Sequence, residues 1–311
     1  MTLVSFIIPH YNSVQYIIET ISSIESQTYR HYEILVVDDN SSEEIFKELK
    51  NIIIGRENIS LYSLPKQFLK GANSCRNFGL LHSKGDFVNF IDSDDIILPN
   101  KIEEQLKVFA NNPDLGMVVC KTQYFADSTS NKLEILQEQD FSVSFDFLEA
   151  YLSKKSLWCT NSALIRKSKL GDISFHPGFL DAHEWLFYVE LMIAGINVGF
   201  VNNVLVLKRK HSGSIGNSSL SKKLPSLIKS RLLVIDFINS SSLDSAVYKK
   251  FLIDDLNSFL KSSAKRNMYS LYFSTISKFN LSVSEKVKCF INYTIHSITK
   301  KGDSLISIPN N

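Results

Sequence analysis

The stretch Phe87-Val88-Asn89-Phe90-Ile91-Asp92-Ser93-Asp94-Asp95 decides the fold of this chain. Its apolar, β-forming half predicts a buried strand between Gly85 and Pro99, and this strand runs into three acids within four residues. Open α/β sheets bind ligands at the carboxyl ends of their strands, where these acids would lie. Carboxylates this close repel one another unless a cation such as Mg²⁺ or Mn²⁺ compensates them. The stretch alone leaves two interpretations open, a metal site or an acidic turn that caps the next helix.

Strand and helix patterns alternate around this stretch. β-rich runs occur at residues 4–8, 34–37, 59–64 and 117–120, and apolar residues at helical spacing separate them. Asn12 or Ser13 is expected to cap the helix after the first run. The alternation predicts an α/β, Rossmann-like fold with a mostly parallel sheet flanked by helices. The second run ends at Asp38-Asp39, which would bring another acid pair to the same crevice.

The composition is that of an ordinary globular protein with an uneven distribution of charge. Of the 311 residues, 44% are hydrophobic and 21% are charged, which allows a substantial core. The net charge of the chain is +2. From Ser221 onward there are 14 Lys/Arg and 6 Asp/Glu, whereas the first 220 residues contain 20 Lys/Arg and 26 Asp/Glu. A basic C-terminal part favours an anionic surface or partner. We expect one domain at residues 1–220 and a basic helical region at residues 221–311.

Several classes of protein are disfavoured by what the sequence lacks. The four cysteines, Cys75, Cys120, Cys159 and Cys289, have no metal-ligand spacing, so we expect free, mostly buried thiols in a reducing cytoplasm. No basic leader and no apolar run of about 18 residues occurs, so we expect neither a signal peptide nor a transmembrane helix. Glycine-rich dinucleotide and P-loop motifs are also missing. The phosphates of a nucleotide would have to be neutralised by a metal and basic side chains.

Four segments stand in an order and at a spacing typical of one enzyme family. They are Val4-Ser5-Phe6-Ile7-Ile8-Pro9-His10-Tyr11-Asn12, Glu33-Ile34-Leu35-Val36-Val37-Asp38-Asp39-Asn40-Ser41, Gly71-Ala72-Asn73-Ser74-Cys75-Arg76-Asn77-Phe78-Gly79 and the opening stretch. Together they resemble glycosyltransferase family 2, whose members have the GT-A fold. The resemblance implies an inverting, metal-dependent transfer of a sugar from a nucleotide diphosphate, typically a UDP-sugar, to a hydroxyl acceptor. Residues 1–120 would be the nucleotide-binding half of the catalytic domain, and residues 121–220 the acceptor half.

The resemblance implies a nucleotide pocket beside the first strands. Pro9 and Tyr11 would shape this pocket, with Tyr11 packing on the base or ribose. Asp39 would accept a hydrogen bond from the base, typically uracil, and Arg76 would lie near the diphosphate, which suits a guanidinium group. Taken alone, Tyr11 is interpreted as a core or loop aromatic, Asp39 as a helix cap and Arg76 as a partner in a surface ion pair.

Asp92 and Asp94 correspond to the Asp-x-Asp pair of the resembling enzymes. Asp94 would bind Mn²⁺ or Mg²⁺, Asp92 would contact both the metal and the ribose, and Asp95 would orient them from the second layer.

The segment Lys208-Arg209-Lys210-His211-Ser212-Gly213-Ser214 resembles the family's Arg-x-His-x-x-Ser segment. His211 would ligate the metal or touch the diphosphate, and Arg209 would help to hold the leaving phosphate. Outside this resemblance, a histidine in a basic loop is usually exposed and without a role.

The general base of the resembling enzymes lies in a Glu-Asp-Trp segment that opens a helix. Here Leu180-Asp181-Ala182-His183-Glu184-Trp185 falls at its place, and Trp185 aligns Glu184 with the base. Such a base takes the proton of the acceptor hydroxyl as this hydroxyl attacks the sugar. Glutamate is longer than the usual aspartate, and Asp181 is the second candidate. Without the resemblance, Glu184 is interpreted as a first-turn acid that complements the helix dipole.

The C-terminal region has helical periodicity at residues 224–239, 246–262, 269–278 and 287–299. We expect a helical appendage that packs on the catalytic domain or on a second copy of the chain, as in a homodimer. Basic amphipathic helices also bind anionic lipid, so a peripheral membrane contact stays open. No nucleic-acid-binding motif accompanies the charge, and we expect no nucleic-acid partner.

The sequence therefore predicts a cytoplasmic glycosyltransferase, with a peripheral place at the inner face of the membrane left open. Its acceptor would be a saccharide or lipid-linked saccharide in the assembly of a bacterial surface polysaccharide or lipopolysaccharide. A processive synthase is disfavoured because no Gln-x-x-Arg-Trp segment follows Glu184. Two alternatives remain. One is a nucleotidyltransferase, although its basic, glycine-rich loop is missing; the other is a catalytically silent sugar-nucleotide or glycan-binding module, which the atypical His183-Glu184 pair allows.

Overall fold

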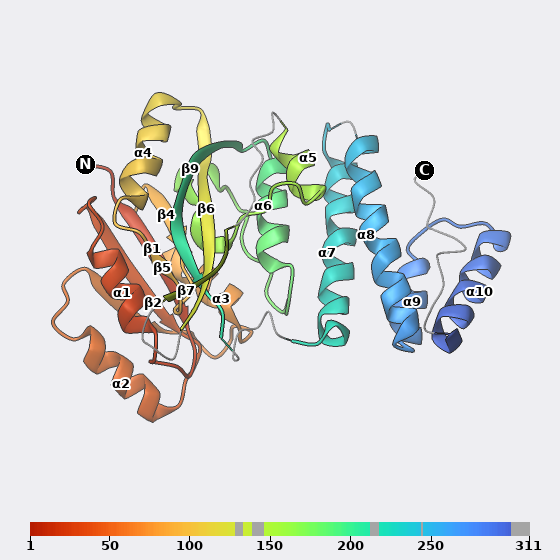
Figure 1. Ribbon diagram of the computed structural model, residues 1–311, viewed down its shortest axis with the longest axis horizontal. Helices are drawn as coiled ribbons and strands as arrows, with labels where there is room; N and C mark the ends of the chain where they lie inside the picture. The colour runs from red at the N-terminus through yellow and green to blue at the C-terminus, as the bar shows by residue number, and fades with distance from the viewer. Residues whose placement is uncertain (128–132, 139–145, 212–217, 244, 300–311) are drawn as a thin grey trace. The chain divides into compact units, whose positions relative to one another are not determined.

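The chain forms two compact units in a computed structural model, which describes residues 1–127, 133–138, 146–211, 218–243 and 245–299 (Figure 1). The first unit contains Met1–Gly178 and Phe187–Ser214, and the second contains Phe179–Leu186 and Ile215–Asn311. The second unit thus includes a short stretch that precedes the predicted boundary at residue 220. Residues 212–214, the end of the segment that resembles Arg-x-His-x-x-Ser, lie outside the described residues.

The N-terminal half of the sheet in the first unit is parallel. Its strands lie in the order β3-β2-β1-β4, and they are β1 (Val4–His10), β2 (Tyr32–Asp38), β3 (Ile59–Ser63) and β4 (Phe87–Phe90). β1 is buried along its whole length, as its continuous apolar run predicts. β1 pairs with both β2 and β4, so the carboxyl ends of the three strands lie at one edge. The acid segments after β2 and β4 therefore reach the same edge, as predicted.

The second half of the sheet contains antiparallel pairings that the alternation of strands and helices did not predict. The order continues from β4 through β8 (Leu164–Arg166), β6 (Leu115–Asp127) and β9 (Asn197–Arg209) to β5 (Ile96–Ile97), while β7 (Leu133–Glu138) pairs with β6. β6 and β9 are parallel, whereas β8, β5 and β7 pair antiparallel. β8 and β5 have three and two residues, too few for a strand period to be recognised. The predicted α/β class is confirmed, with a sheet that is parallel in its first half and mixed in its second.

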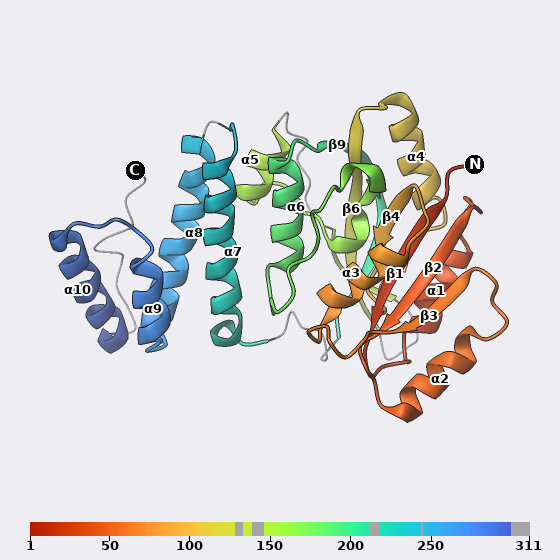
Figure 2. The ribbon, with the colours of Figure 1, turned by 180° about the vertical axis from the view of Figure 1, so that it is seen from behind.

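Helices cover both faces of this sheet (Figures 1 and 2). α1 (Ile17–Glu25), α2 (Glu43–Ile53) and α4 (Lys101–Asn111) share one core with the side chains on one face of β1. α3 (Ala72–His82) packs on the other face, where Gly79 permits a close approach: a Cβ there would lie 2.4 Å from Ile7 Cγ2. The helical elements between β7 and β9 are α5 (Phe147–Leu152), the 3₁₀ turns η1 (Thr160–Ser162) and η2 (Lys167–Lys169), and α6 (His183–Ile193).

The helix after β1 begins later than predicted. α1 starts after Tyr16, and no side chain caps its first turn. Asn12 instead has a left-handed backbone (φ 46°), and its Oδ1 accepts a hydrogen bond from the Ser42 N–H at 2.9 Å. The prediction that Asn12 or Ser13 caps the helix is therefore wrong, because Asn12 ties the loop after β1 to the loop after β2.

The second unit is helical, and its helices confirm the four predicted stretches. They are α7 (Leu220–Ser240), α8 (Ser245–Lys265), α9 (Tyr269–Ile276) and α10 (Val283–Thr299), which share one apolar core. A cavity of about 460 Å³ in this unit is lined in part by Lys229, Lys249 and Lys278. Among the described residues, every helix is too short or too polar to cross a membrane. All four cysteines are free and buried, as predicted.

Candidate functional site

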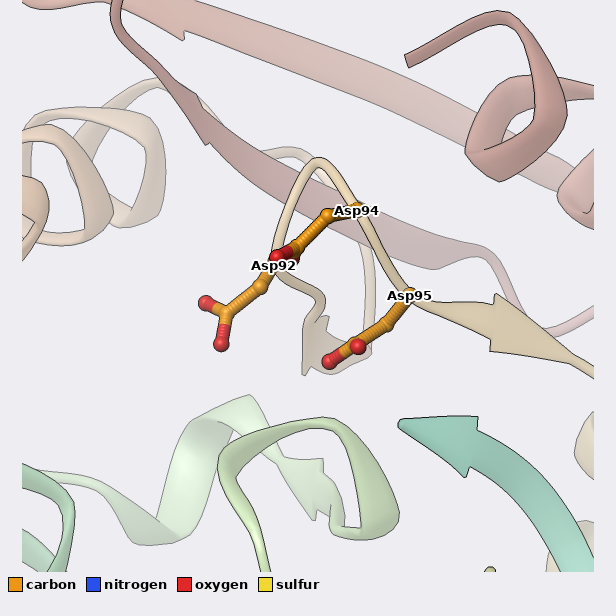
Figure 3. A group of neighbouring side chains, drawn as sticks. All are labelled: Asp92, Asp94 and Asp95. Atoms are coloured by element: carbon orange, nitrogen blue, oxygen red, sulfur yellow. The ribbon is translucent and has the colours of Figure 1, made fainter. Parts of the chain in front are cut away.

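Three aspartates lie together at the carboxyl edge of the sheet. Asp92, Asp94 and Asp95 occupy one short loop between the buried strand β4 and the two-residue strand β5 (Figure 3). One carboxylate oxygen from each lies within 4.8 Å of the corresponding atoms of the other two. Three acids that the sequence places in one turn thus have side chains close enough to act on one ligand.

Asp95 is held by hydrogen bonds from two other elements. Its side chain is 1% exposed; Oδ1 accepts a hydrogen bond from the Arg209 backbone N–H at 2.9 Å, and Oδ2 accepts one from Asn161 Nδ2 at 2.5 Å. Burial, reinforced by the negative charges of Asp94 and Asp92, raises the pKa of Asp95 well above its usual value. Asp95 therefore ties the loop to the end of β9 and to η1, which agrees with the supporting role predicted for it.

Asp92 and Asp94 are half-buried and surrounded by basic groups. Arg76 Nη2 donates a hydrogen bond to Asp92 Oδ1 at 2.5 Å, and Lys208 Nζ lies 3.6 Å from Asp92 Oδ2. His211 Nε2 lies 2.9 Å from Asp94 Oδ2. Burial and then the charge of Asp92 raise the pKa of Asp94, against the effect of the His211 hydrogen bond. The ionised form of Asp94 is thus not fully compensated by protein groups.

The donor atoms at this edge fit a divalent cation. Mg²⁺ and Mn²⁺ prefer carboxylate oxygens, and Asp92, Asp94 and Asp95 each have one within 4.8 Å of those of the other two. His211, just after β9, is close enough to Asp94 to add a nitrogen ligand.

Asp38 and Asp39, at the end of β2, have different surroundings. Both oxygens of Asp38 accept hydrogen bonds, from the side chain and backbone of Ser41, and Oδ1 also lies 2.8 Å from His10 Nδ1. Asp39 is 7% exposed and its Oδ2 accepts a hydrogen bond from the Gly71 N–H at 2.8 Å. Its Oδ1 is buried without a hydrogen-bond partner among the described residues. Burial raises the pKa of Asp39, and a buried acceptor of this kind is suited to a ligand N–H.

Pro9 and Tyr11, the two nucleotide-pocket residues predicted on β1 and the loop after it, differ in their exposure to solvent. Pro9 is buried within β1, where it pairs with Val37 of β2. Tyr11 is 54% exposed, and Lys70 Nζ lies 5.6 Å from the centre of its ring. The exposed Tyr11 ring is available for stacking, and the role of Pro9 in shaping the pocket stays a prediction.

The two predicted arginines are both buried. Arg76, on α3, is 2% exposed, and its guanidinium lies over the Phe175 ring as well as against Asp92. Arg209 is 3% exposed; its Nε donates to the Asp94 backbone oxygen at 3.0 Å and its Nη2 donates to Glu19 at 2.5 Å. Both arginine side chains donate hydrogen bonds to the loop that carries Asp92, Asp94 and Asp95. Lys208, which also lies beside Asp92, is more exposed than Arg76.

The candidate bases belong to the second unit. Glu184 lies in the first turn of α6, and Asp181 precedes this helix. Both oxygens of Asp181 are engaged: Oδ1 accepts a hydrogen bond from the Ala182 N–H at 2.6 Å, and Oδ2 lies 3.3 Å from Lys223 Nζ. Ala182 has a left-handed backbone (φ 59°), which is uncommon for a residue with a side chain. Asp181 thus has contacts on both of its carboxylate oxygens, and the assignment of the base to Glu184 or Asp181 stays a prediction.

The sequence did not single out two residues of this site, Asn161 and Lys208. Asn161 lies in a segment that the sequence assigned to the acceptor side, and its bond to Asp95 joins positions 66 residues apart. Lys208 stands in the quoted basic segment, but charge alone did not distinguish it from Arg209. Alternation along β9 is the one signal that would have helped, since it places consecutive side chains on opposite faces.

Comparison with known proteins identifies relatives for both the sequence and the fold. The profile of Glycosyl transferase family 2 matches residues 5–173, more than half of the chain. Glycosyltransferase GlyG of Streptococcus pneumoniae is 28% identical over 222 residues, which cover 68% of this chain and 72% of GlyG. WfgD of Escherichia coli, a UDP-Glc:alpha-D-GlcNAc-diphosphoundecaprenol beta-1,3-glucosyltransferase, is 41% identical over 111 residues, which cover 35% of this chain and 42% of WfgD.

Solved structures share the fold at low sequence identity. S. aureus TarS 1-349 in complex with UDP-GlcNAc gives a TM-score of 0.67 at 19% identity, covering 96% of this chain and 82% of that chain. The mannosyltransferase PcManGT of Pyrobaculum calidifontis, in complex with GDP-Man and Mn²⁺, gives a TM-score of 0.52 at 14% identity. These likenesses confirm the predicted GT-A fold class.

Proposed function

The chain belongs to glycosyltransferase family 2 and is a glycosyltransferase, and we propose that it moves a sugar from a UDP-sugar to a hydroxyl group with the help of a divalent cation. The observation that carries this proposal is the placing of Asp92 and Asp94 at the same sheet edge as the unpaired Asp39 oxygen. The carboxylates of Asp92 and Asp94 can bind a cation, and Asp39 Oδ1 can accept a hydrogen bond from the nucleotide base.

Asp92 and Asp94 would hold Mn²⁺ or Mg²⁺, with His211 as a further ligand. When bound, the cation stabilises the negative charge that develops on the departing diphosphate. Arg76 keeps Asp92 in place through their 2.5 Å hydrogen bond, and Arg209 does the same for the backbone at Asp94. These buried arginines therefore preorganise the donor site, and a direct contact of Arg209 with the leaving phosphate stays a prediction.

The base of the donor would be selected at Asp39. Its unpaired Oδ1 is a suitable acceptor for the imide N–H of uracil, and the exposed Tyr11 ring would stack on the base or ribose. Pro9 shapes the strand end behind them. A guanine or uracil ring presents an imide N–H, whereas cytosine presents an acceptor at that position, so Asp39 disfavours cytosine.

Glu184 would take the proton of the acceptor hydroxyl as this oxygen attacks the sugar carbon and the bond to the diphosphate breaks. The reaction is then a single displacement that inverts the configuration. Asp181 is the second candidate, although its carboxylate is engaged by Lys223 and the Ala182 N–H.

The acceptor is proposed from the relatives. WfgD and WfaP of Escherichia coli are named for transfer to GlcNAc linked to diphosphoundecaprenol, and a lipid-linked saccharide in bacterial surface glycan assembly is the acceptor class we propose here. Access to such an acceptor would give the basic second unit a role at the inner face of the membrane. That contact and a homodimer stay predictions.

The test is UDP release from a panel of UDP- and GDP-sugars, with a synthetic GlcNAc α-diphosphate carrying an alkyl chain as acceptor. We expect turnover with one or more UDP-sugars, loss of turnover with EDTA, and recovery with Mn²⁺ or Mg²⁺. Asp94→Asn should abolish turnover with little change in thermal unfolding. Binding of UDP-sugar without turnover would favour the silent binding module, and pyrophosphate production from a sugar phosphate and UTP would favour a nucleotidyltransferase. Full turnover of Asp94→Asn in EDTA would contradict the metal role.

A further inference from the structure

The segment Phe179–Leu186 belongs to the second unit although it interrupts the first in the sequence. It carries both candidate bases and the start of α6, and it is connected at both ends to residues of the first unit. The partners of this segment within its own unit therefore decide how the base is held.

The first three residues of the segment run antiparallel to α7. Asp181 Oδ2 lies 3.3 Å from Lys223 Nζ, and the Leu180 N–H donates a hydrogen bond to Ser226 Oγ at 3.0 Å. Lys229 Nζ lies 4.9 Å from the centre of the Phe179 ring. Successive residues of the segment thus meet positions three apart on the helix, which is about one turn each.

A further contact is made by Arg231, further along α7. Its guanidinium carbon lies 3.9 Å from the centre of the Trp185 ring, next in sequence to Glu184. Asp255 of α8 pairs with the same guanidinium, and its Oδ2 accepts hydrogen bonds from Nη2 at 2.8 Å and from Nε at 3.0 Å. Arg231 is 4% exposed and Trp185 is 8% exposed, so this stack is shielded from water. A buried cation–π contact with a paired guanidinium is stronger than one at a surface.

The backbone of the segment needs such support. Ala182 has φ 59°, a conformation that persists in a residue with a side chain only when its surroundings hold it. A misplacement of about 1 Å in a catalytic group is enough to lower turnover by about 100-fold. Contacts that fix the first turn of α6 are therefore expected to act on the chemical step.

We propose that α7 positions the general base, with Arg231 as the positioning residue that holds Trp185, and through it Glu184, in register. This inference rests on the proposed role of Glu184. The contribution of α7 is then made through the contact of Arg231 with Trp185 and the pairs of Lys223 and Ser226 with the segment.

The test compares full-length variants by UDP release, using the most active UDP-sugar of the panel and the GlcNAc α-diphosphate acceptor. Arg231→Lys keeps a charge beside Asp255 but loses the planar stack, and we expect kcat to fall about 10- to 100-fold. The Kd for UDP, measured by calorimetry, should stay within about twofold, because the donor residues belong to the first unit. A fall in donor affinity equal to the fall in kcat would overturn the inference.

A double variant separates positioning from general damage. In a Glu184→Gln background the base is already lost, so adding Arg231→Lys should lower the residual kcat by no more than about twofold. An undiminished 10- to 100-fold effect of Arg231→Lys in that background would show that Arg231 acts on something other than the base.

Lys223→Met provides a second variant in case Arg231→Lys is poorly folded. Its side chain is about as long but cannot pair with Asp181, and we expect a lower kcat at an unchanged unfolding temperature. Lys222→Met is the matched control on the neighbouring exposed position and should behave like the wild type. An unchanged kcat in Lys223→Met and Arg231→Lys, with a strongly reduced kcat in Glu184→Gln, sinks this inference and leaves the proposed function standing. A wild type that releases no UDP defeats both.

Discussion

Replacing Asp39 by Asn changes one atom of the proposed uracil contact while keeping the contact that the fold requires. The amide oxygen of Asn can still accept the Gly71 N–H, which lies 2.8 Å from Asp39 Oδ2. The amide nitrogen then takes the place of Oδ1, the buried oxygen without a partner among the described residues. A ligand imide N–H would meet a donor there instead of an acceptor.

The expected loss follows from the kind of bond removed. A hydrogen bond to a charged group contributes about 1.5 to 3 kcal/mol, so the Kd for UDP should rise roughly 10- to 150-fold. The site is 7% exposed, so water cannot readily restore the lost acceptor. Cytosine presents an acceptor where uracil presents the imide N–H, and the Asn amide can donate to it. In Asp39→Asn the Kd for UDP should therefore rise while the Kd for CDP falls, so the ratio of the Kd for CDP to the Kd for UDP should decrease by more than the change in either Kd.

Calorimetric titration with UDP and CDP in the presence of Mn²⁺ measures this ratio. Asp38→Asn is the matched control, because its carboxylate is occupied by His10 and Ser41 and should affect stability without changing the preference for uracil. Binding of UDP by Asp39→Asn within about twofold of the wild type would refute the uracil contact, since the smallest expected loss is about tenfold.

Three further predictions concern stability. Burial alone would raise the pKa of Asp38, but hydrogen bonds from His10 and Ser41 lower it below 3.8. Ionised Asp38 therefore contributes to the stability of the fold above about pH 4, and this contribution is lost as the pH falls below that value. The free energy of unfolding in urea should thus depend less on pH in Asp38→Asn than in the wild type below about pH 4. Burial lowers the pKa of Lys101 from 10.5 to about 8. As the pH rises from about 8 to about 10.5, the free energy of unfolding of the wild type should therefore increase by up to about 3 kcal/mol relative to that of Lys101→Met. A difference between the two proteins that does not change with pH would contradict this prediction. Gly79→Ala places a Cβ 2.4 Å from a side-chain atom of β1 and should lower the free energy of unfolding by about 1 to 3 kcal/mol, measured in urea; an unchanged midpoint would mean that α3 can shift without strain.

The sequence predicted the parallel half of the sheet because β-rich runs alternate there with apolar residues at helical spacing. Local pattern was sufficient there, and it also brought Asp39, Asp92 and Asp94 to one edge. β8 has three residues and no period to detect, and its place beside β4 depends on pairing with β6 as well. The antiparallel pairings of the mixed half could not be predicted for that reason.

The surroundings of the site residues were less predictable than their identities. Arg209 pairs with Glu19 over 190 residues, and Asp95 binds Asn161 over 66, so no window of sequence contains both partners. The same limit applies to Asn12, which the sequence offered as a helix cap and which instead binds Ser42 thirty residues later. Side chains that can cap a helix can also tie two loops together, and only the tertiary arrangement selects between these roles.

Helix α6 begins in the second unit and continues in the first. This division restricts which segments of the chain can be exchanged in evolution. An exchange of everything after residue 214 for the C-terminal part of another protein would leave Phe179–Leu186 facing a foreign helix. Replacement of that short segment alone would leave Arg231 without its ring. The two stretches must be inherited together or altered together. In a set of related sequences, residues 179–186 should therefore covary with α7 more strongly than with their immediate neighbours in the chain.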